Sequence, residues 1–297
     1  MMKRRGAIAI GSNSTRLLVA DVENGALFNI HRGREETRLF LGLDEQGMIA
    51  PEKIESTARA VARLAREARA QGAEDTALFA TSATRDAGNG KDLADRIFAL
   101  CGLTLQIITG EREAELAFLA AAGMERKLIM DIGGGSTEFT IGEGGKILSS
   151  FSAQLGASRL LKACPIASVQ DALVAREQAR AILEKELEKM RPFFPAPDMT
   201  GLGGTCTTAA AIRMGYEAHG EMVEGQVISL QEAERQLLLM ASLPLEAREK
   251  IPGLPPSRAA HMPHGLCILT AAMQLCGKNE ITVSGRTNLD GYLMQSE

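Results

Sequence analysis

The stretch from 127 to 141 constrains the fold of this chain most strongly, and it reads K-L-I-M-D-I-G-G-G-S-T-E-F-T-I. An apolar run ends at Asp131, three glycines follow, and alternation of polar and apolar residues resumes at Glu138. This pattern predicts a strand, a tight glycine turn and a second strand. Glycines without a Cβ let backbone N–H groups converge on an anion, so we expect a phosphate-binding turn formed by Gly133, Gly134, Gly135 and Ser136. The alternative interpretation is a plain β-hairpin whose glycines serve turn geometry alone.

Two carboxylates flank this turn. Asp131 lies before the turn and is separated from it by Ile132. Glu138 lies after the turn and is separated from it by Thr137. A divalent cation held by these carboxylates would bridge them to phosphate oxygens, because Mg²⁺ prefers carboxylate and phosphate oxygen ligands. We therefore predict that Asp131 and Glu138 are metal ligands.

The same unit occurs earlier in the chain. The hexapeptide 10–15, I-G-S-N-S-T, aligns with 132–137, I-G-G-G-S-T, at a constant spacing of 122 positions, and each copy follows a short apolar strand. Two copies about one small domain apart predict a duplicated architecture, with two phosphate-gripping turns that face each other across a cleft. The phosphate-binding residues expected in the first copy are Gly11, Ser12, Asn13 and Ser14. One difference concerns the metal, since Ala9 stands where the second copy has Asp131.

Arg85 follows a predicted buried strand, 77–80, within the Ser/Thr-rich segment T-S-A-T-R-D-A. A strand that runs into such a turn and then a helix is common where an oxyanion binds, so Arg85 could grip a substrate phosphate. A surface Arg paired with Asp86 is the alternative. Four further arginines, Arg16, Arg32, Arg34 and Arg38, could form a basic rim, although solvated surface charge explains them equally well.

A strand is predicted at 103–108, and Glu113 lies in the first turn of the helix predicted after Gly110. Acidic residues at that position usually serve the helix dipole and the cap, which accounts for Glu111. The helix of Glu113, however, links the first predicted domain to the strand that carries Asp131. A carboxylate there would face the predicted cleft and could orient or deprotonate a water molecule.

A third glycine-rich stretch, 201–205, runs into an Ala-rich helix. A glycine loop at a helix N-terminus suits a phosphate, so Gly203, Gly204 and Thr205 are further candidate phosphate-binding residues, on a pattern that is weak by itself. We interpret the neighbouring Cys206 as a packed residue and not as a nucleophile.

Composition bounds the class of protein. The chain has 297 residues, enough for two domains with their own cores, and 45% of them are hydrophobic. The net charge of −4 argues against a nucleic-acid-binding surface that covers the whole protein. No segment approaches the apolar length of a membrane span, and five scattered cysteines fit reduced thiols, so we expect a cytoplasmic protein without a membrane partner.

These motifs together resemble the exopolyphosphatase and guanosine-pentaphosphate phosphatase family, within the actin/hexokinase/Hsp70 superfamily. The resemblance spans essentially the whole chain, and its most specific parts are the segments D-I-G-G-G-S-T-E at 131–138 and T-S-A-T-R-D-A at 81–87. It implies an α/β fold of two ribonuclease-H-like domains with a catalytic cleft between them, which we place at 1–122 and 123–297. The length resembles that of the short, two-domain members of the family.

The resemblance also implies an activity and its residues. Glu113 would be the general base, Asp131 and Glu138 would hold Mg²⁺, and Arg85 would grip phosphate. The implied reaction is hydrolysis of the terminal phosphoanhydride bond of inorganic polyphosphate or guanosine pentaphosphate. No nucleic acid partner is implied, and a homodimer is left open.

The chain departs from the family pattern at several positions. Ala9 and Ala260 replace Asp residues of the family, Arg112 replaces a Glu, and Thr287-Asn288-Leu289 replaces Gly-Leu-Arg. A weakly active or inactive homologue that binds polyphosphate or an alarmone is therefore an alternative to the hydrolase. A sugar or acetate kinase on the same fold is a third hypothesis, which the phosphatase-type motifs around Arg85 and Glu113 disfavour.

Overall fold

The chain folds into two compact units in a computed structural model that describes residues 2–295. The N-terminal unit contains Met1–Ala120 together with Asn288–Glu297, and the C-terminal unit contains Ala121–Thr287. The first boundary lies close to the expected one at 122. The last segment, however, belongs to the N-terminal unit and not, as the sequence suggested, to the second domain.

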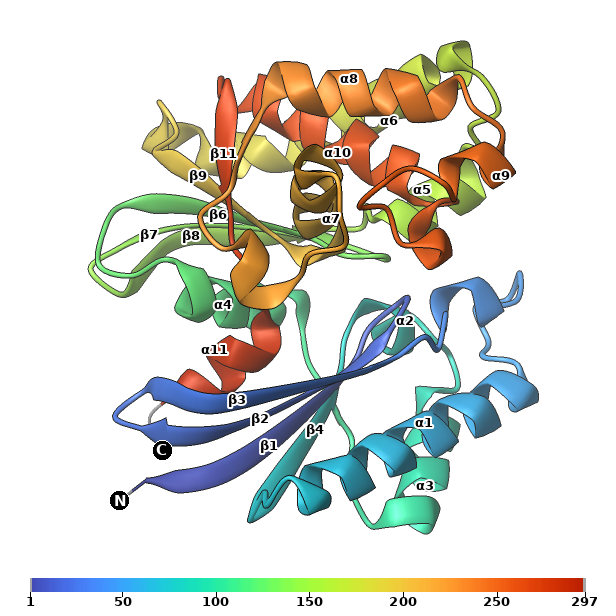
Figure 1. The fold of residues 1–297 in the computed structure, drawn as a ribbon, viewed down its shortest axis with the longest axis vertical. Coiled ribbons are helices and arrows are strands. Elements are labelled where there is room, and N and C mark those ends of the chain that lie inside the picture. The colour runs from blue at the N-terminus through green and yellow to red at the C-terminus, as the bar shows by residue number, and fades with distance from the viewer. Residues whose placement is uncertain (1, 296–297) are drawn as a thin grey trace. The chain divides into compact units, whose positions relative to one another are not determined.

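The N-terminal unit is built on a five-stranded sheet in the order β3-β2-β1-β4-β5 (Figure 1). Its strands are β1 (Lys3–Ile10), β2 (Thr15–Glu23), β3 (Ala26–Glu35), β4 (Asp75–Ala80) and β5 (Gln106–Ile107). Its helices are α1 (Pro51–Ala70), α2 (Ser82–Arg85), α3 (Gly90–Cys101), α4 (Gly110–Ala121) and α11 (Asn288–Met294), with a 3-10 turn η1 (Phe40–Gly42). The strand expected at 103–108 is thus limited to the two residues of β5.

Helices α1 and α3 cover one face of this sheet (Figure 1). Helix α1 begins with Pro51, whose fixed φ suits the first helical turn, and its apolar side packs Val61 and Leu64 against the strands. Ile8 and Ile10 of β1 point into this core. Because side chains alternate along a strand, Ala7 and Ala9 point to the opposite face.

Helix α11 covers that opposite face (Figure 1). Ala9 is 1% exposed and shares an apolar cluster with Leu116 of α4 and Leu289 of α11. Asp290, almost fully buried, accepts hydrogen bonds of 2.6 and 3.1 Å from the guanidinium of Arg32 on β3. This ion pair and the apolar cluster explain why the C-terminal segment belongs to the N-terminal unit.

The C-terminal unit is built on a six-stranded sheet in the order β10-β11-β9-β6-β7-β8. Its strands are β6 (Lys127–Ile132), β7 (Thr137–Glu143), β8 (Lys146–Ala153), β9 (Asp198–Leu202), β10 (Val227–Ser229) and β11 (Glu280–Val283). Its helices are α5 (Ala157–Ala163), α6 (Val169–Leu187), α7 (Gly203–Met214), α8 (Leu230–Ala241), α9 (Leu245–Arg248) and α10 (Met262–Leu275), with the 3-10 turns η2 (Glu188–Phe193), η3 (Gly220–Val223) and η4 (Pro256–Arg258).

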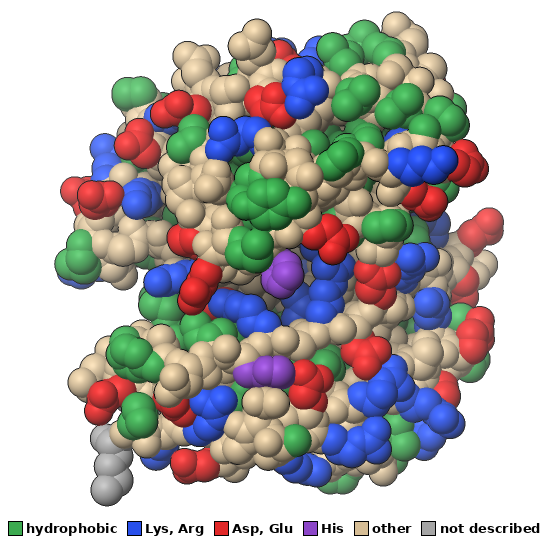
Figure 2. Space-filling view, viewed as in Figure 1, with side chains coloured by type: hydrophobic (Ala, Val, Ile, Leu, Met, Phe, Trp, Pro, Cys, Tyr) green, Lys and Arg blue, Asp and Glu red, His purple; other side chains and the backbone are tan. Residues whose placement is uncertain are grey.

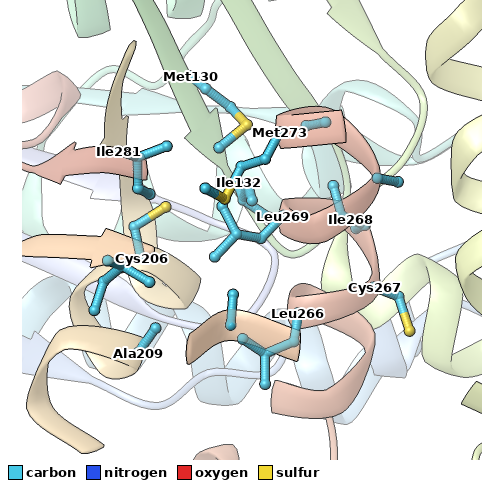
Figure 3. Packing of buried hydrophobic residues seen from close by; sticks show 14 of the residues in the cluster. Met130, Ile132, Cys206, Ala209, Leu266, Cys267, Ile268, Leu269, Met273 and Ile281 are labelled. Carbon is cyan, nitrogen blue, oxygen red and sulfur yellow. The ribbon is translucent and has the colours of Figure 1, made fainter. Parts of the chain in front are cut away.

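The core of this unit lies between its sheet and the buried helix α10. Met130 and Ile132 of β6 lie beside Leu269 and Met273 of α10 (Figure 3). Alternation along β6 therefore directs Asp131, between Met130 and Ile132, away from this core. The fold of the unit thus presents a carboxylate near the carboxyl end of β6, on the side away from the apolar core.

The predicted duplication is confirmed. Both units contain an antiparallel hairpin next to parallel strands, since β3-β2-β1-β4-β5 has its counterpart in β8-β7-β6-β9-β11. The two hairpins also share one register, in which Ile10 pairs with Thr15 and Ile132 pairs with Thr137. The two glycine turns therefore occupy equivalent positions, each at the carboxyl end of the first strand of its hairpin.

Charged side chains of both signs are interspersed on the visible face of each unit, in keeping with the small net charge (Figure 2). Across residues 2–295, no helix combines the length and the apolar character needed to span a bilayer.

Candidate active site

Asp131 and Glu138 lie side by side on β6 and β7. The two residues are cross-strand partners, so their side chains leave the same face of the sheet with Cβ atoms about 5 Å apart. Both are buried, with exposures of 8% for Asp131 and 2% for Glu138. Two buried carboxylates at this spacing repel each other unless a cation or a proton compensates their charge.

Residues of β8 and α7 contact the two carboxylates. Ser152 of β8 donates a hydrogen bond of 2.7 Å from Oγ to Oε1 of Glu138, which orients that carboxylate. Gly203, with φ of +83°, lies so close to Asp131 that an added Cβ would stand 2.3 Å from Oδ1. Only glycine fits at position 203. The third glycine-rich stretch therefore packs directly against the side chain of Asp131.

The pair has the ligand chemistry of a divalent-cation site. Among residues 2–295, no cluster of three or more His, Cys, Asp or Glu side chains could hold a metal. Mg²⁺ does not need such a cluster, because it is commonly bound by one or two carboxylates together with water and substrate phosphate oxygens. Asp131 and Glu138 would supply those carboxylates.

The first turn has the same backbone and different side chains. Gly11 donates its N–H to the carbonyl of Ser14 at 3.0 Å, as Gly133 does to Ser136 at the same distance. At the register positions of Asp131, Glu138 and Ser152 stand Ala9, Arg16 and Arg34.

The arginines make the first turn cationic. Arg34 donates from Nε to Oγ of Ser14 at 3.1 Å, so its charge lies at the turn. Burial, and then the neighbouring charge of Arg16, lower the pKa of Arg34 below its usual value, whereas the charge of Glu36, whose Oε1 lies 3.6 Å from Nη2 of Arg34, acts in the opposite direction. Of the expected basic rim, Arg16 and Arg34 therefore lie at the turn, whereas Arg32 pairs with Asp290.

Arg85 and Glu113 come together in the N-terminal unit. Arg85 ends α2, and its Nη1 lies 3.4 Å from Oε2 of Glu113 and 3.0 Å from the carbonyl of Ile108. Glu113 is 7% exposed. The other nitrogen of the fork, Nη2, is buried without a hydrogen-bond acceptor among the described residues. An Arg that carries such a donor can accommodate an anion when it rearranges.

The segment that carries Arg85 is attached to the first turn. Thr81, between β4 and α2, donates its N–H to the carbonyl of Ile10 at 3.1 Å. Strands β1, β4 and β5 are parallel, so the first turn, Thr81 and Ile108 follow the same edge of the sheet. Glu113 and Arg85 thus belong to the edge at which the first turn lies.

The third glycine stretch opens α7 beside Asp131. Arg258 of η4 contacts the carbonyl of Gly204 and donates a hydrogen bond of 2.5 Å to Oγ1 of Thr208. Thr205 is 5% exposed and packs against Gly265, where an added Cβ would stand only 2.3 Å from Oγ1 of Thr205. The next residue, Cys206, is no nucleophile, because burial and the charge of Asp131 raise the pKa of its thiol well above the usual value.

The structure thus divides the candidate residues into two sets. Gly11, Ser12, Asn13, Ser14, Arg85 and Glu113 belong to the N-terminal unit, and Asp131, Glu138, Gly133, Gly134, Gly135, Ser136, Gly203, Gly204 and Thr205 belong to the C-terminal unit. Sequence reasoning did not identify Ser152, whose role depends on strand register, or Arg258, which sequence alone associated with no site.

Comparison with known proteins identifies the family of this chain. The sequence model of the Ppx/GppA phosphatase family matches residues 18–297. Exopolyphosphatase 2 of Mycobacterium tuberculosis is 34% identical over 99% of this chain and 98% of its own length. The Aquifex aeolicus PPX-GPPA enzyme has a similar structure, with a TM-score of 0.83 at 27% identity over all of both chains. An exopolyphosphatase from Cytophaga hutchinsonii gives a TM-score of 0.87 at 25% identity, over 98% of this chain and 96% of its own.

Proposed function

Because the chain belongs to the Ppx/GppA phosphatase family, we propose that it releases orthophosphate from the terminal phosphoanhydride bond of inorganic polyphosphate. The similarity to an exopolyphosphatase over the full length of both chains supports polyphosphate as the substrate. Guanosine pentaphosphate carries the same kind of bond and is the second substrate to test.

The observation that carries the proposal is the buried pair of Asp131 and Glu138. These two carboxylates would hold a divalent cation, and the phosphate oxygens of a phosphoanhydride substrate are ligands of the kind such a cation prefers. The bound Mg²⁺ would neutralise charge on the phosphate oxygens as the bond to the bridging oxygen breaks.

The remaining chemistry is assigned to side chains and backbone of this chain. Glu113 accepts a proton from the water that attacks the terminal phosphorus, and the bridging oxygen leaves with the shortened chain. Arg85 orients Glu113 through their contact and turns its unpaired donor to a phosphate oxygen. The amides of the glycine turns stabilise the charge that develops on the transferred group.

The loss of the family Asp at position 9 does not by itself predict an inactive binding protein. Ala9 lies in an apolar cluster with Leu289, which stands where the family has Arg. Residues 9 and 289 are both apolar here, so the replacements leave no unpaired buried charge at these two positions.

The test is the release of orthophosphate from long-chain polyphosphate, measured with Mg²⁺ and with a chelator, and repeated with guanosine pentaphosphate. Release that requires Mg²⁺ and disappears in Glu113→Gln supports the proposal. Tight binding of polyphosphate without release would instead identify the binding homologue, and transfer of phosphate from ATP to a sugar or acetate would identify a kinase.

A further inference from the structure

Helix α5 follows β8 and begins directly against the second glycine turn. Ala157 donates its N–H to the carbonyl of Gly133 at 3.0 Å. Ser158 and Arg159 donate theirs to the carbonyl of Gly134, at 2.8 and 3.0 Å. The first amides of a helix have no partner within the helix, and here the carbonyls of the turn satisfy them.

The side chain of Arg159 extends this contact to a third carbonyl. Its Nε donates to the carbonyl of Gly135 at 2.6 Å, and its Nη2 donates to Oε1 of Gln154 at 2.9 Å. Three consecutive carbonyls of the turn, those of Gly133, Gly134 and Gly135, are therefore held toward α5.

This arrangement fixes the direction of the turn amides. In a planar trans peptide, the N–H of each residue points opposite to the carbonyl of the residue before it. With their carbonyls held by α5, the peptide groups of the turn direct the N–H groups of Gly134, Gly135 and Ser136 away from the helix. Successive amides that point to one side form an anion-binding concavity.

The helix itself is anchored at both ends. At its start, Gly156 packs so closely that a Cβ would stand 2.4 Å from the carbonyl carbon of Gly134. At its end, Nε2 of His264 lies 2.9 Å from the carbonyl of Cys164, the C-terminal cap of α5. Burial lowers the pKa of His264 to about 4, so the ring is neutral at pH 7 and donates from Nε2 to this carbonyl.

The first turn is held differently. Its carbonyls at Ser12 and Asn13 accept hydrogen bonds from the amides of Phe40 and Arg38, at 2.9 and 2.8 Å. These donors belong to an irregular segment in which Arg38 has a positive φ of 46°. Backbone amides of this segment thus hold the carbonyls of the first turn, whereas the amides of α5 and the guanidinium of Arg159 hold the carbonyls of the second.

We propose that α5 is a positioning element for phosphate in the second turn and that Arg159 is its positioning residue. Arg159 does not touch the reacting atoms in this account. It holds the carbonyl of Gly135, and through that peptide group it aims the amide of Ser136 at the terminal phosphate. The inference rests on the proposed function for the identity of the anion.

The experiment compares Arg159→Ala and Arg159→Lys with the wild type, and Lys162→Ala with both. Lys162 is an exposed cation on the same helix, so its removal changes the charge of α5 and leaves the contacts of Arg159 with the turn in place. Binding of inorganic tripolyphosphate is measured by calorimetry in the presence of Mg²⁺, and KM and kcat are measured with polyphosphate.

Arg159→Ala should weaken tripolyphosphate binding and raise KM by about tenfold, while kcat changes by less than about twofold, because one positioning hydrogen bond is lost from ground and transition states alike. Arg159→Lys restores a donor and should recover most of the affinity. Gly156→Ala displaces α5 from the turn and should weaken binding as Arg159→Ala does, which keeps the test intact if Arg159→Ala fails to fold.

Equal binding by wild type and Arg159→Ala would overturn the inference, as would an equal loss in Lys162→Ala, since charge alone would then explain the effect. A wild type that binds tripolyphosphate but releases no orthophosphate refutes the proposed function, and the binding comparison still decides the role of α5. A wild type without affinity for tripolyphosphate refutes both.

Discussion

The two glycine turns of this protein are built on the same backbone, and the residues around them carry opposite charge. In both hairpins a glycine N–H donates to a serine carbonyl three residues later at 3.0 Å. Across the adjacent strands, the row beside the first turn reads Ala9, Arg16, Arg34, and the row beside the second reads Asp131, Glu138, Ser152.

The duplicated turn therefore does not have a duplicated role. A turn flanked by two arginines attracts phosphate directly, whereas a turn flanked by two buried carboxylates repels phosphate unless a cation lies between them. We therefore assign the metal, and the phosphate contact of turn amides beside it, to the second turn, and phosphate contact through arginine side chains to the first. The predictions that follow test this division.

The largest effect is expected from Asp131→Asn. It removes one of two metal carboxylates at almost constant volume and should lower kcat/KM at fixed Mg²⁺ by about 10³-fold, or roughly 4 kcal/mol. Arg16→Gln, at the position equivalent to Glu138, is the comparison change at the first turn. It should raise KM and leave the Mg²⁺ dependence unchanged, as measured by orthophosphate release over a Mg²⁺ series. A loss of Mg²⁺ dependence in Arg16→Gln would contradict the division of roles.

The second effect concerns Glu113. Glu113→Gln keeps the volume and the contact with Arg85 but removes the proton acceptor, so kcat should fall by about 10²-fold or more while tripolyphosphate binding is retained. Glu111→Gln, in the same first turn of α4, is the control and should retain activity within about threefold. If Glu113→Gln turned over at the wild-type rate, Glu113 would be a helix-terminal carboxylate only.

Local patterns in the sequence predicted the hairpins, the turns and the helix of Glu113 because these depend on neighbouring residues. The two I-G-x-x-S-T stretches likewise predicted the duplication, because turns of the same geometry at equivalent strand ends need similar residues. The strand predicted at 103–108 is mostly loop, because Leu103 and Leu105 pack against the core without strand pairing.

Features that depend on contacts between distant residues were not predictable. Asp290 pairs with Arg32 across 258 residues of sequence, and this pair helps to assign α11 to the N-terminal unit. The contact of Ser152 with Glu138 requires the register of two strands. Ala9, which by sequence is a missing ligand, is by packing a member of an apolar cluster.

The third effect tests the space that phosphate needs at the second turn. Gly134→Val places a β-branched side chain where an anion must approach backbone amides, and should weaken tripolyphosphate binding by more than about tenfold. Ser12 is the equivalent residue of the first turn, and Ser12→Ala should change affinity by less than about threefold because it removes no backbone donor. Unchanged affinity in a folded Gly134→Val variant would reduce the glycines to turn geometry.

The smallest effect on rate is expected at Ala9. Ala9→Asp buries a carboxylate among Leu116, Leu289 and their neighbours, and should lower the free energy of unfolding by about 1–3 kcal/mol without reducing the Mg²⁺ requirement. Adding Leu289→Arg should recover part of this loss, measured as a double-mutant cycle in thermal unfolding. A lower Mg²⁺ requirement in Ala9→Asp would mean that the first turn is also a metal site.

Metal binding in the absence of substrate distinguishes the roles of the two turns most directly. Mn²⁺, followed by electron paramagnetic resonance, serves as the probe for wild type, Asp131→Asn, Glu138→Gln and Arg16→Gln. We predict that wild type and Arg16→Gln bind the ion with equal affinity, and that either carboxylate change weakens binding by about tenfold or more. Full affinity in folded Asp131→Asn and Glu138→Gln would contradict the central claim that the second turn holds the metal.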